Sequence, residues 1–156
     1  MAMKISERDK EYIKEMQEGM SLGVFGRRVL NNRKVWKVIE KEIEKYDIKE
    51  IVTAGEIGGV TEIARKVAKQ KGIGLKLYFP DRERFARGCY AHRGLMIATT
   101  SDRILIVWDG ESKGTHNEIE LCNKLGIKYE LAKIDAIEDS MIDSLENIDN
   151  EWIKEL

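Results

Sequence analysis

Cysteine, histidine and proline are scarce in this sequence, with two, two and one among 156 residues. Cys89 and Cys122 lie far apart without metal-ligand spacing, so a disulfide framework is excluded and reduced thiols are expected. His92 and His116 are too few for a metal site. We therefore expect a fold stabilised by its apolar core, with no metal and no cofactor.

Long hydrophobic runs and an excess of one charge are also missing. No apolar run could span a bilayer, and the first residues lack the apolar core of a signal peptide. Lysine and arginine, 27 in all, nearly balance 28 aspartates and glutamates, so the formal net charge is −1. A broad cationic field for nucleic acid is absent. These features predict a cytoplasmic protein without a membrane partner, and they disfavour a nucleic-acid partner.

Short apolar runs alternate along the chain with segments whose apolar residues recur at helical spacing. The runs predicted as strands cover residues 22–25, 51–54, 75–79, 103–108 and 128–131. Strands alternating with helices imply a parallel sheet covered on both faces. We predict an α/β fold: a Rossmann-like, doubly wound parallel sheet of about five strands in three α/β/α layers.

The chain divides into three predicted parts. Residues 1–20 form an N-terminal helical extension, and residues 21–133 form the Rossmann-like domain. Residues 134–156 are acidic, with apolar residues every three or four positions, which predicts an amphipathic C-terminal helical tail. The tail and the helix predicted for residues 90–100 offer apolar faces, so we expect a homodimer.

The loop after the fourth strand is the most informative segment. It begins Asp109-Gly110 and reaches Lys113, Gly114 and Thr115, where the next helix is predicted to start. A glycine-bearing loop presents backbone N–H groups, and a helix N-terminus carries a partial positive charge, so the pair suits a phosphate. Thr115 can cap the helix and bind the phosphate in the same geometry, while Lys113 adds a positive charge.

Two other loops are expected at the same edge of the sheet. Right-handed crossovers place the loops after the first, second and fourth strands together, around the point where strand order reverses. Gly55, Gly58 and Gly59 follow the second strand and would let the backbone approach a phosphate, although a tight turn is the alternative. Arg27 follows the first strand and could reach a phosphate, with an ordinary solvated arginine as the alternative.

Three segments together carry a family resemblance. Residues 53–55 precede a glycine pair at 58–59, residues 90–96 lead through residues 101–102 into an apolar strand, and residues 114–118 read Gly-Thr-His-Asn-Glu. They resemble the SLOG-type superfamily of Rossmann-like nucleotide-binding domains, which includes the Lonely Guy phosphoribohydrolases (lysine-decarboxylase-like proteins) and the DNA-processing protein A domain. Small uncharacterised members are the most similar overall, and the resemblance covers roughly Leu22 to Leu131.

The resemblance implies catalytic roles for Arg93 and Glu118. In the Lonely Guy family an arginine before the fourth strand and the glutamate of Gly-Thr-x-x-Glu act on the N-glycosidic bond of a nucleoside monophosphate. Arg93 and Glu118 occupy the matching places, but the family's Pro-Gly-Gly before Gly-Thr is absent. The string also resembles nucleoside deoxyribosyltransferases, whose nucleophilic glutamate lies at the corresponding place.

The same residues can be interpreted without the family. A carboxylate at Glu118 could stabilise or attack an oxocarbenium-like centre, or orient a water, whereas by position alone it is an ordinary acid near a helix start. Arg93 could bind a phosphate, hold Glu118 in register or form a surface ion pair. Glu56 could be a second carboxylate, but a solvated loop acid is the stronger interpretation.

Two functions remain open from the sequence. The first is an enzyme that hydrolyses or transfers the N-glycosidic bond of a nucleotide or nucleoside. The second is a non-catalytic domain that senses a nucleotide-derived ligand, favoured by the missing Pro-Gly-Gly and the charged loop. Handling of single-stranded DNA is a weaker third interpretation, because the acidic balance opposes it.

Overall fold

A computed structural model describes residues 20–27, 30 and 33–134. The predicted N-terminal extension and the acidic tail lie outside the described residues, apart from the few residues at their inner ends. The described chain begins with the strand β1 (Met20–Gly26) and then alternates helix and strand. The remaining elements are α2 (Arg33–Lys45), β2 (Ile48–Ala54), α3 (Gly59–Lys71), β3 (Gly74–Tyr78), α4 (Arg82–Phe85), the 3₁₀ turn η1 (Ala86–Gly88), α5 (Cys89–Thr100), β4 (Arg103–Trp108), α6 (Lys113–Leu125) and β5 (Glu130–Lys133).

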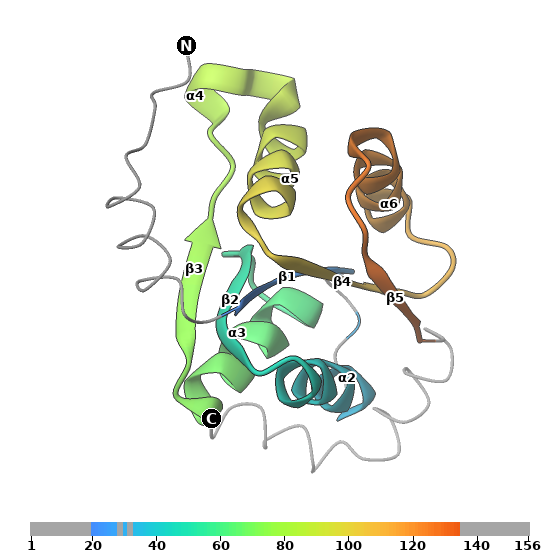
Figure 1. Cartoon of the computed structure of the whole chain (residues 1–156). Helices are drawn as coiled ribbons and strands as arrows, with labels where there is room; N and C mark the ends of the chain where they lie inside the picture. Colours follow the sequence, from blue (N-terminus) through green and yellow to red (C-terminus); the bar gives the residue numbers. More distant parts are fainter. Residues whose placement is uncertain (1–19, 28–29, 31–32, 135–156) are drawn as a thin grey trace, which may run out of the picture.

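The five strands form one parallel sheet in the order β3-β2-β1-β4-β5. Figure 1 shows α2 and α3 on one face of this sheet and α5 and α6 on the other. The predicted Rossmann-like, doubly wound α/β fold with three layers is therefore confirmed for the described residues. Strand order reverses between the neighbours β1 and β4, so their carboxyl ends flank a crevice.

The apolar strand residues divide between the two faces because successive side chains of a strand point to opposite sides. On β1, Leu22 and Val24 pack with the apolar stripes of α2 and α3. Phe25, on the alternate side, packs with Ile97 of α5 and Ile119 of α6. Both faces of the central strands are buried, which explains their nearly continuous apolar sequences.

Several predicted boundaries differ from the structure by one to three residues, including the start of the last strand and the start of α6. The last strand begins at Glu130, two residues later than predicted, because Gly126 ends α6 in a left-handed conformation and residues 127–129 connect the two elements. The helix α6 begins at Lys113, two residues earlier than predicted, because Ser112 provides its N-cap and accepts a hydrogen bond from the Thr115 amide. Thr115 therefore lies inside the first turn and does not cap the helix.

A pair of carboxyl groups lies at the opposite edge of the sheet, where the strands begin. Burial and a hydrogen bond to Glu130 raise the pKa of Glu42 to about 7. Hydrogen bonds with Glu42 and Tyr46, with a further one from Arg103, lower the pKa of Glu130 to about 2. The two groups thus share one proton at mildly acidic pH.

This pair predicts an unusual pH dependence of stability. The contribution of Glu42 is complete below its ordinary pKa of 4.5 and is lost as the pH rises toward 7. The contribution of Glu130 is present above 4.5 and is lost as the pH falls toward 2. As the pH rises from 4.5 to 8, wild type loses this contribution and Glu42→Gln does not. The unfolding free energy of Glu42→Gln, measured by urea titration, should therefore rise by about 2 kcal/mol relative to that of wild type over this range. Glu44→Gln, in an exposed position of α2, is the control, and equal behaviour of the two variants would contradict the interpretation.

Candidate functional site

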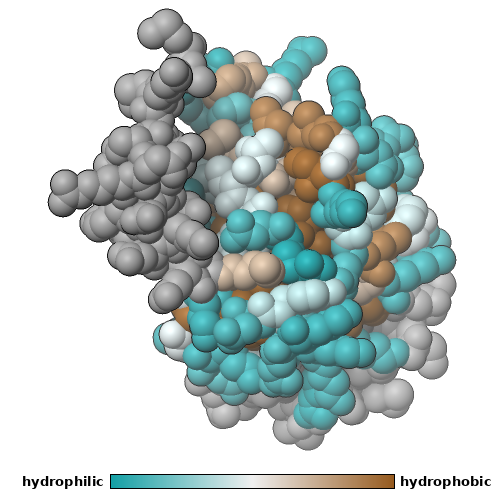
Figure 2. Space-filling model, in the orientation of Figure 1, coloured by the Kyte–Doolittle hydropathy of each residue, from teal (hydrophilic) through white to brown (hydrophobic). Residues whose placement is uncertain are grey.

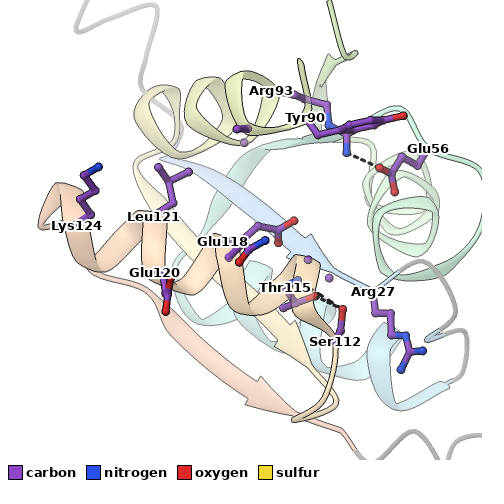
Figure 3. A pocket seen from close by; sticks show the side chains of 15 residues that line it. Arg27, Glu56, Tyr90, Arg93, Ser112, Thr115, Glu118, Glu120, Leu121 and Lys124 are labelled. Atoms are coloured by element: carbon purple, nitrogen blue, oxygen red, sulfur yellow. Dashed lines mark hydrogen bonds and ion pairs between the residues drawn. The ribbon is translucent and has the colours of Figure 1, made fainter. Parts of the chain in front are cut away.

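A cavity of about 630 Å³ opens at the carboxyl edge of the sheet, between α5 and α6 (Figure 3). The end of β1, the loop after β2 and the loop and helix after β4 all contribute to its lining, with α5 as the remaining wall. The sequence predicted this convergence of loops from right-handed crossovers alone. A cavity of this volume at the switch point of a parallel sheet is a usual place for a small-molecule ligand.

Five of the predicted site residues line the cavity, and they come from three different elements or loops. They are Arg27, Arg93, Gly114, Thr115 and Glu118. Gly114 and Thr115 belong to the first turn of α6, where the backbone amides of a helix have no intrahelical acceptor. The structure thus brings the predicted anion-binding helix end and the two predicted catalytic side chains into one cavity.

The glycines after β2 lie outside the lining of the cavity. The amide of Gly58 donates to the Glu62 carboxylate at 3.0 Å, and the amide of Val60 donates to the Arg27 carbonyl at 3.3 Å. Gly58 and Gly59 have positive φ angles of 85° and 71°, so they form a turn that non-glycine residues would strain. The Phe79 ring packs over Gly55. The structure therefore supports the tight-turn interpretation of this segment, since these amides already have protein acceptors.

Asp109, Gly110 and Lys113 also lie outside the lining. The buried Asp109 carboxylate accepts hydrogen bonds from the amides of Glu111 and Ser112, at 2.9 and 2.8 Å, and pairs with Arg27. Burial alone would raise the pKa of Asp109, but these donors together lower it. Asp109 therefore organises the loop before α6, and much of the charge of Arg27 is directed to this carboxylate rather than into the cavity.

Glu118 is the sixth residue of α6 and lies in its second turn, because the helix begins at Lys113, two residues earlier than predicted. Its Oε2 atom is buried and has no hydrogen-bond partner among the described residues. Burial raises the pKa of Glu118 to about 8, the positive charge of Arg93 opposes the rise, and the negative charge of Glu56 adds to it. The carboxyl group is therefore mostly protonated at neutral pH and can donate a proton.

Arg93 and Glu56 form an ion pair on the other side of the cavity from α6 (Figure 3). Their side chains are only 11% and 28% exposed, so water screens the pair weakly. The backbone of Glu56 is itself fixed, since Arg65 donates to its carbonyl at 2.5 Å and to the Ala54 carbonyl at 2.8 Å. The favoured interpretation of Glu56 as a solvated loop acid does not describe this arrangement, because the side chain is paired and lines the cavity.

A smaller recess of about 30 Å³ adjoins the cavity and shares Glu56, Arg93 and Glu118 with it. Thr61 of α3 contributes to its lining. This volume is enough for one water molecule, and the surrounding side chains offer both donors and acceptors. The carboxyl groups are thus placed around a space in which a water could approach a bound ligand.

Several lining residues were not singled out from the sequence, chiefly on α6. Asn117, Glu120, Leu121 and Lys124 line the cavity along that helix. They continue the stripe that begins at Gly114, at spacings of three and four residues, so helical periodicity from the Gly-Thr motif could have found them. Ser112 was missed because the helix start was placed at Thr115.

Comparisons with family models, with curated proteins and with solved structures each gave no match to this chain. No helix in the described part of the chain has both the length and the apolar character needed to cross a membrane. Among the described residues, no three histidine, cysteine, aspartate or glutamate side chains converge as metal ligands. The site must therefore be interpreted from its own geometry.

The structural role of Asp109 leads to a stability prediction. Asp109→Ala leaves two loop amides and Arg27 without their acceptor, so it should lower the unfolding free energy by about 2–4 kcal/mol in urea titration. Asp81→Ala, which removes the N-cap of the short helix α4, should lower it by about 1 kcal/mol or less. A loss at Asp109 no larger than the loss at Asp81 would contradict this role.

Proposed function

We propose that this chain binds a nucleotide or nucleotide-derived ligand in the cavity and hydrolyses its N-glycosidic bond. One observation carries the proposal: Glu118, whose buried Oε2 atom has no hydrogen-bond partner among the described residues, lines the same cavity as the Arg93–Glu56 ion pair. A buried carboxyl group with a raised pKa beside an ionised one is a pattern typical of acid–base chemistry.

The amino end of α6 is the proposed phosphate site. The first-turn amide of Gly114 has no intrahelical acceptor, and Gly114 lines the cavity together with Ser112 and Thr115, which supply hydroxyl groups. Helix amides and the helix dipole favour an anion at this position. Thr115 and Glu118 are three residues apart on α6, or about 4.5 Å along the helix axis. A phosphate at the helix start would therefore leave the sugar close to Glu118.

The side chains of Glu118 and Glu56 can then carry out different steps of the reaction. Protonated Glu118 donates its proton to the departing base as the bond between the anomeric carbon and the base nitrogen breaks, and the bonding electrons leave with the base. Ionised Glu56 stabilises the developing positive charge on the sugar and takes a proton from the water that adds to the anomeric carbon. Exchange with solvent restores both groups.

The family resemblance supports the same assignment. Glu118 lies in the Gly-Thr-x-x-Glu string that resembles Lonely Guy phosphoribohydrolases and nucleoside deoxyribosyltransferases, within the SLOG-type superfamily. The proposal differs from that resemblance in one respect, because Arg93 pairs with Glu56 and so acts through a second carboxylate.

A non-catalytic nucleotide sensor is the second candidate. The pairing of Arg27 with Asp109 favours it, since the cation expected near the phosphate is directed into the loop. The charged loop in place of Pro-Gly-Gly is consistent with this alternative. A sensor would bind the same ligands without releasing a base.

Product analysis with Glu118→Gln separates the two candidates. We expect the wild-type protein to release free base from at least one member of a panel of nucleoside mono- and diphosphates, nucleosides and NAD. Glu118→Gln should lower turnover at least about 100-fold, because it removes the proton donor, while ligand affinity stays within about threefold. Turnover should also fall as the pH rises above 8, where Glu118 loses its proton.

Glu120→Gln is the matched control, since Glu120 lies on the same helix and lines the same cavity. It should keep most of the wild-type turnover. Release of no base, with a nucleotide still raising the melting temperature, would favour the sensor. If no nucleotide or sugar phosphate raises the melting temperature, both candidates fail.

A further inference from the structure

A glycine in the interior of α5 lacks an evident structural reason. Gly94 lies in the middle of Cys89–Thr100, where glycine destabilises a helix relative to alanine. In the described part of the chain, the other glycines in α-helices occupy the first two positions, Gly59 of α3 and Gly114 of α6. Gly94 has no positive φ angle that would require a glycine.

Packing does not require glycine at this position either. A Cβ atom at Gly94 would lie 3.7 Å from Cδ2 of Leu121 and 3.9 Å from Cε1 of Phe25, which are ordinary van der Waals contacts. At Gly26, by contrast, a Cβ atom would lie only 2.5 Å from Val60. The protein could therefore accommodate alanine at position 94, and it would gain helix stability from it.

Gly94 does border the functional cavity. It lines both the large cavity and the adjoining recess. Tyr90 and Ala91 lie one turn earlier on α5 and line the same cavity, as does Leu121 of α6. Figure 2 shows apolar side chains gathered between these two helices, with hydrophilic side chains around them. This part of the cavity suits a flat apolar group rather than a phosphate or a sugar.

Tyr90 offers an aromatic surface for such a group. Its ring is about half exposed, and Arg82 donates a hydrogen bond to its hydroxyl at 2.7 Å. The Arg93 guanidinium lies 5.2 Å from the ring centroid, a cation–π distance. These two contacts hold the ring in place while about half of Tyr90 stays exposed, as a stacking surface requires.

We propose that Gly94 keeps open a base-binding slot between α5 and α6, in which a nucleobase lies against Tyr90 and Leu121. The inference rests on the proposed nucleotide ligand and adds the place of its base. Leu121 follows Glu118 by three residues on α6, so phosphate, sugar and base would be arranged in order along the helix. The Asn117 amide, which lines the cavity, supplies a donor and an acceptor for the edge of the base.

Gly94→Ala tests the slot because it should raise the stability of the protein while it weakens nucleotide binding. We expect its melting temperature to rise by about 1–4 °C, as helix propensity predicts. The affinity for nucleoside monophosphates, measured by calorimetry, should fall at least about fivefold, while the affinity for ribose 5-phosphate should stay within about twofold. Tyr90→Ala should show the same loss for nucleotides, and Tyr90→Phe should show little loss because the ring remains.

Thr99→Ala is the matched control, because Thr99 lies on the exposed end of α5 away from the cavity. It should leave both affinities unchanged. The slot is excluded if Gly94→Ala binds nucleotides as tightly as wild type, or if it weakens nucleotides and ribose 5-phosphate equally. If the wild-type protein binds neither ligand, the proposed function fails and the slot fails with it.

Discussion

The reversal of strand order between β1 and β4 is the constraint on which the rest of this site depends. Because the chain leaves these neighbouring strands toward opposite faces of the sheet, no helix can cover the crevice between their carboxyl ends. The amino end of α6 and the side chains of α5 therefore meet over an open cavity. Asp109 fixes the loop that delivers α6 to this position.

Within that crevice, burial controls the electrostatics. The Oε2 atom of Glu118 is buried and has no hydrogen-bond partner among the described residues, whereas Glu56 pairs with Arg93. The two carboxyl groups thus lie in different electrostatic environments within one cavity, which is what the proposed proton transfer to a leaving group and stabilisation of a cation both need. A purely structural position would leave no reason to bury an unpaired carboxyl group beside a cavity, since burial without a partner is destabilising.

The sequence predicted the fold and the place of the site well, because apolar periodicity and crossover handedness depend on local patterns. The predicted convergence of loops placed Arg27, Gly114 and Thr115 at the cavity, and the family resemblance singled out Arg93 and Glu118, which also line it. The sequence could not predict that Arg93 pairs with Glu56, which lies 37 residues away, or that Asp109 binds Arg27 across 82 residues. Such pairs depend on tertiary distances. The sequence could not single out Gly94, because its proposed role depends on the space that a Cβ atom at this position would occupy.

The protonation state of Glu118 tests this account most directly. Carbon-13 NMR of side-chain carboxyl groups in the full chain, assigned with Glu118→Gln, would follow its titration between pH 3 and pH 10. The account predicts a midpoint near 8 for Glu118, because burial raises its pKa by more than the positive charge of Arg93 lowers it. A midpoint near the ordinary value of 4.5 would show a solvated carboxylate, and the proposed proton donor would then be contradicted.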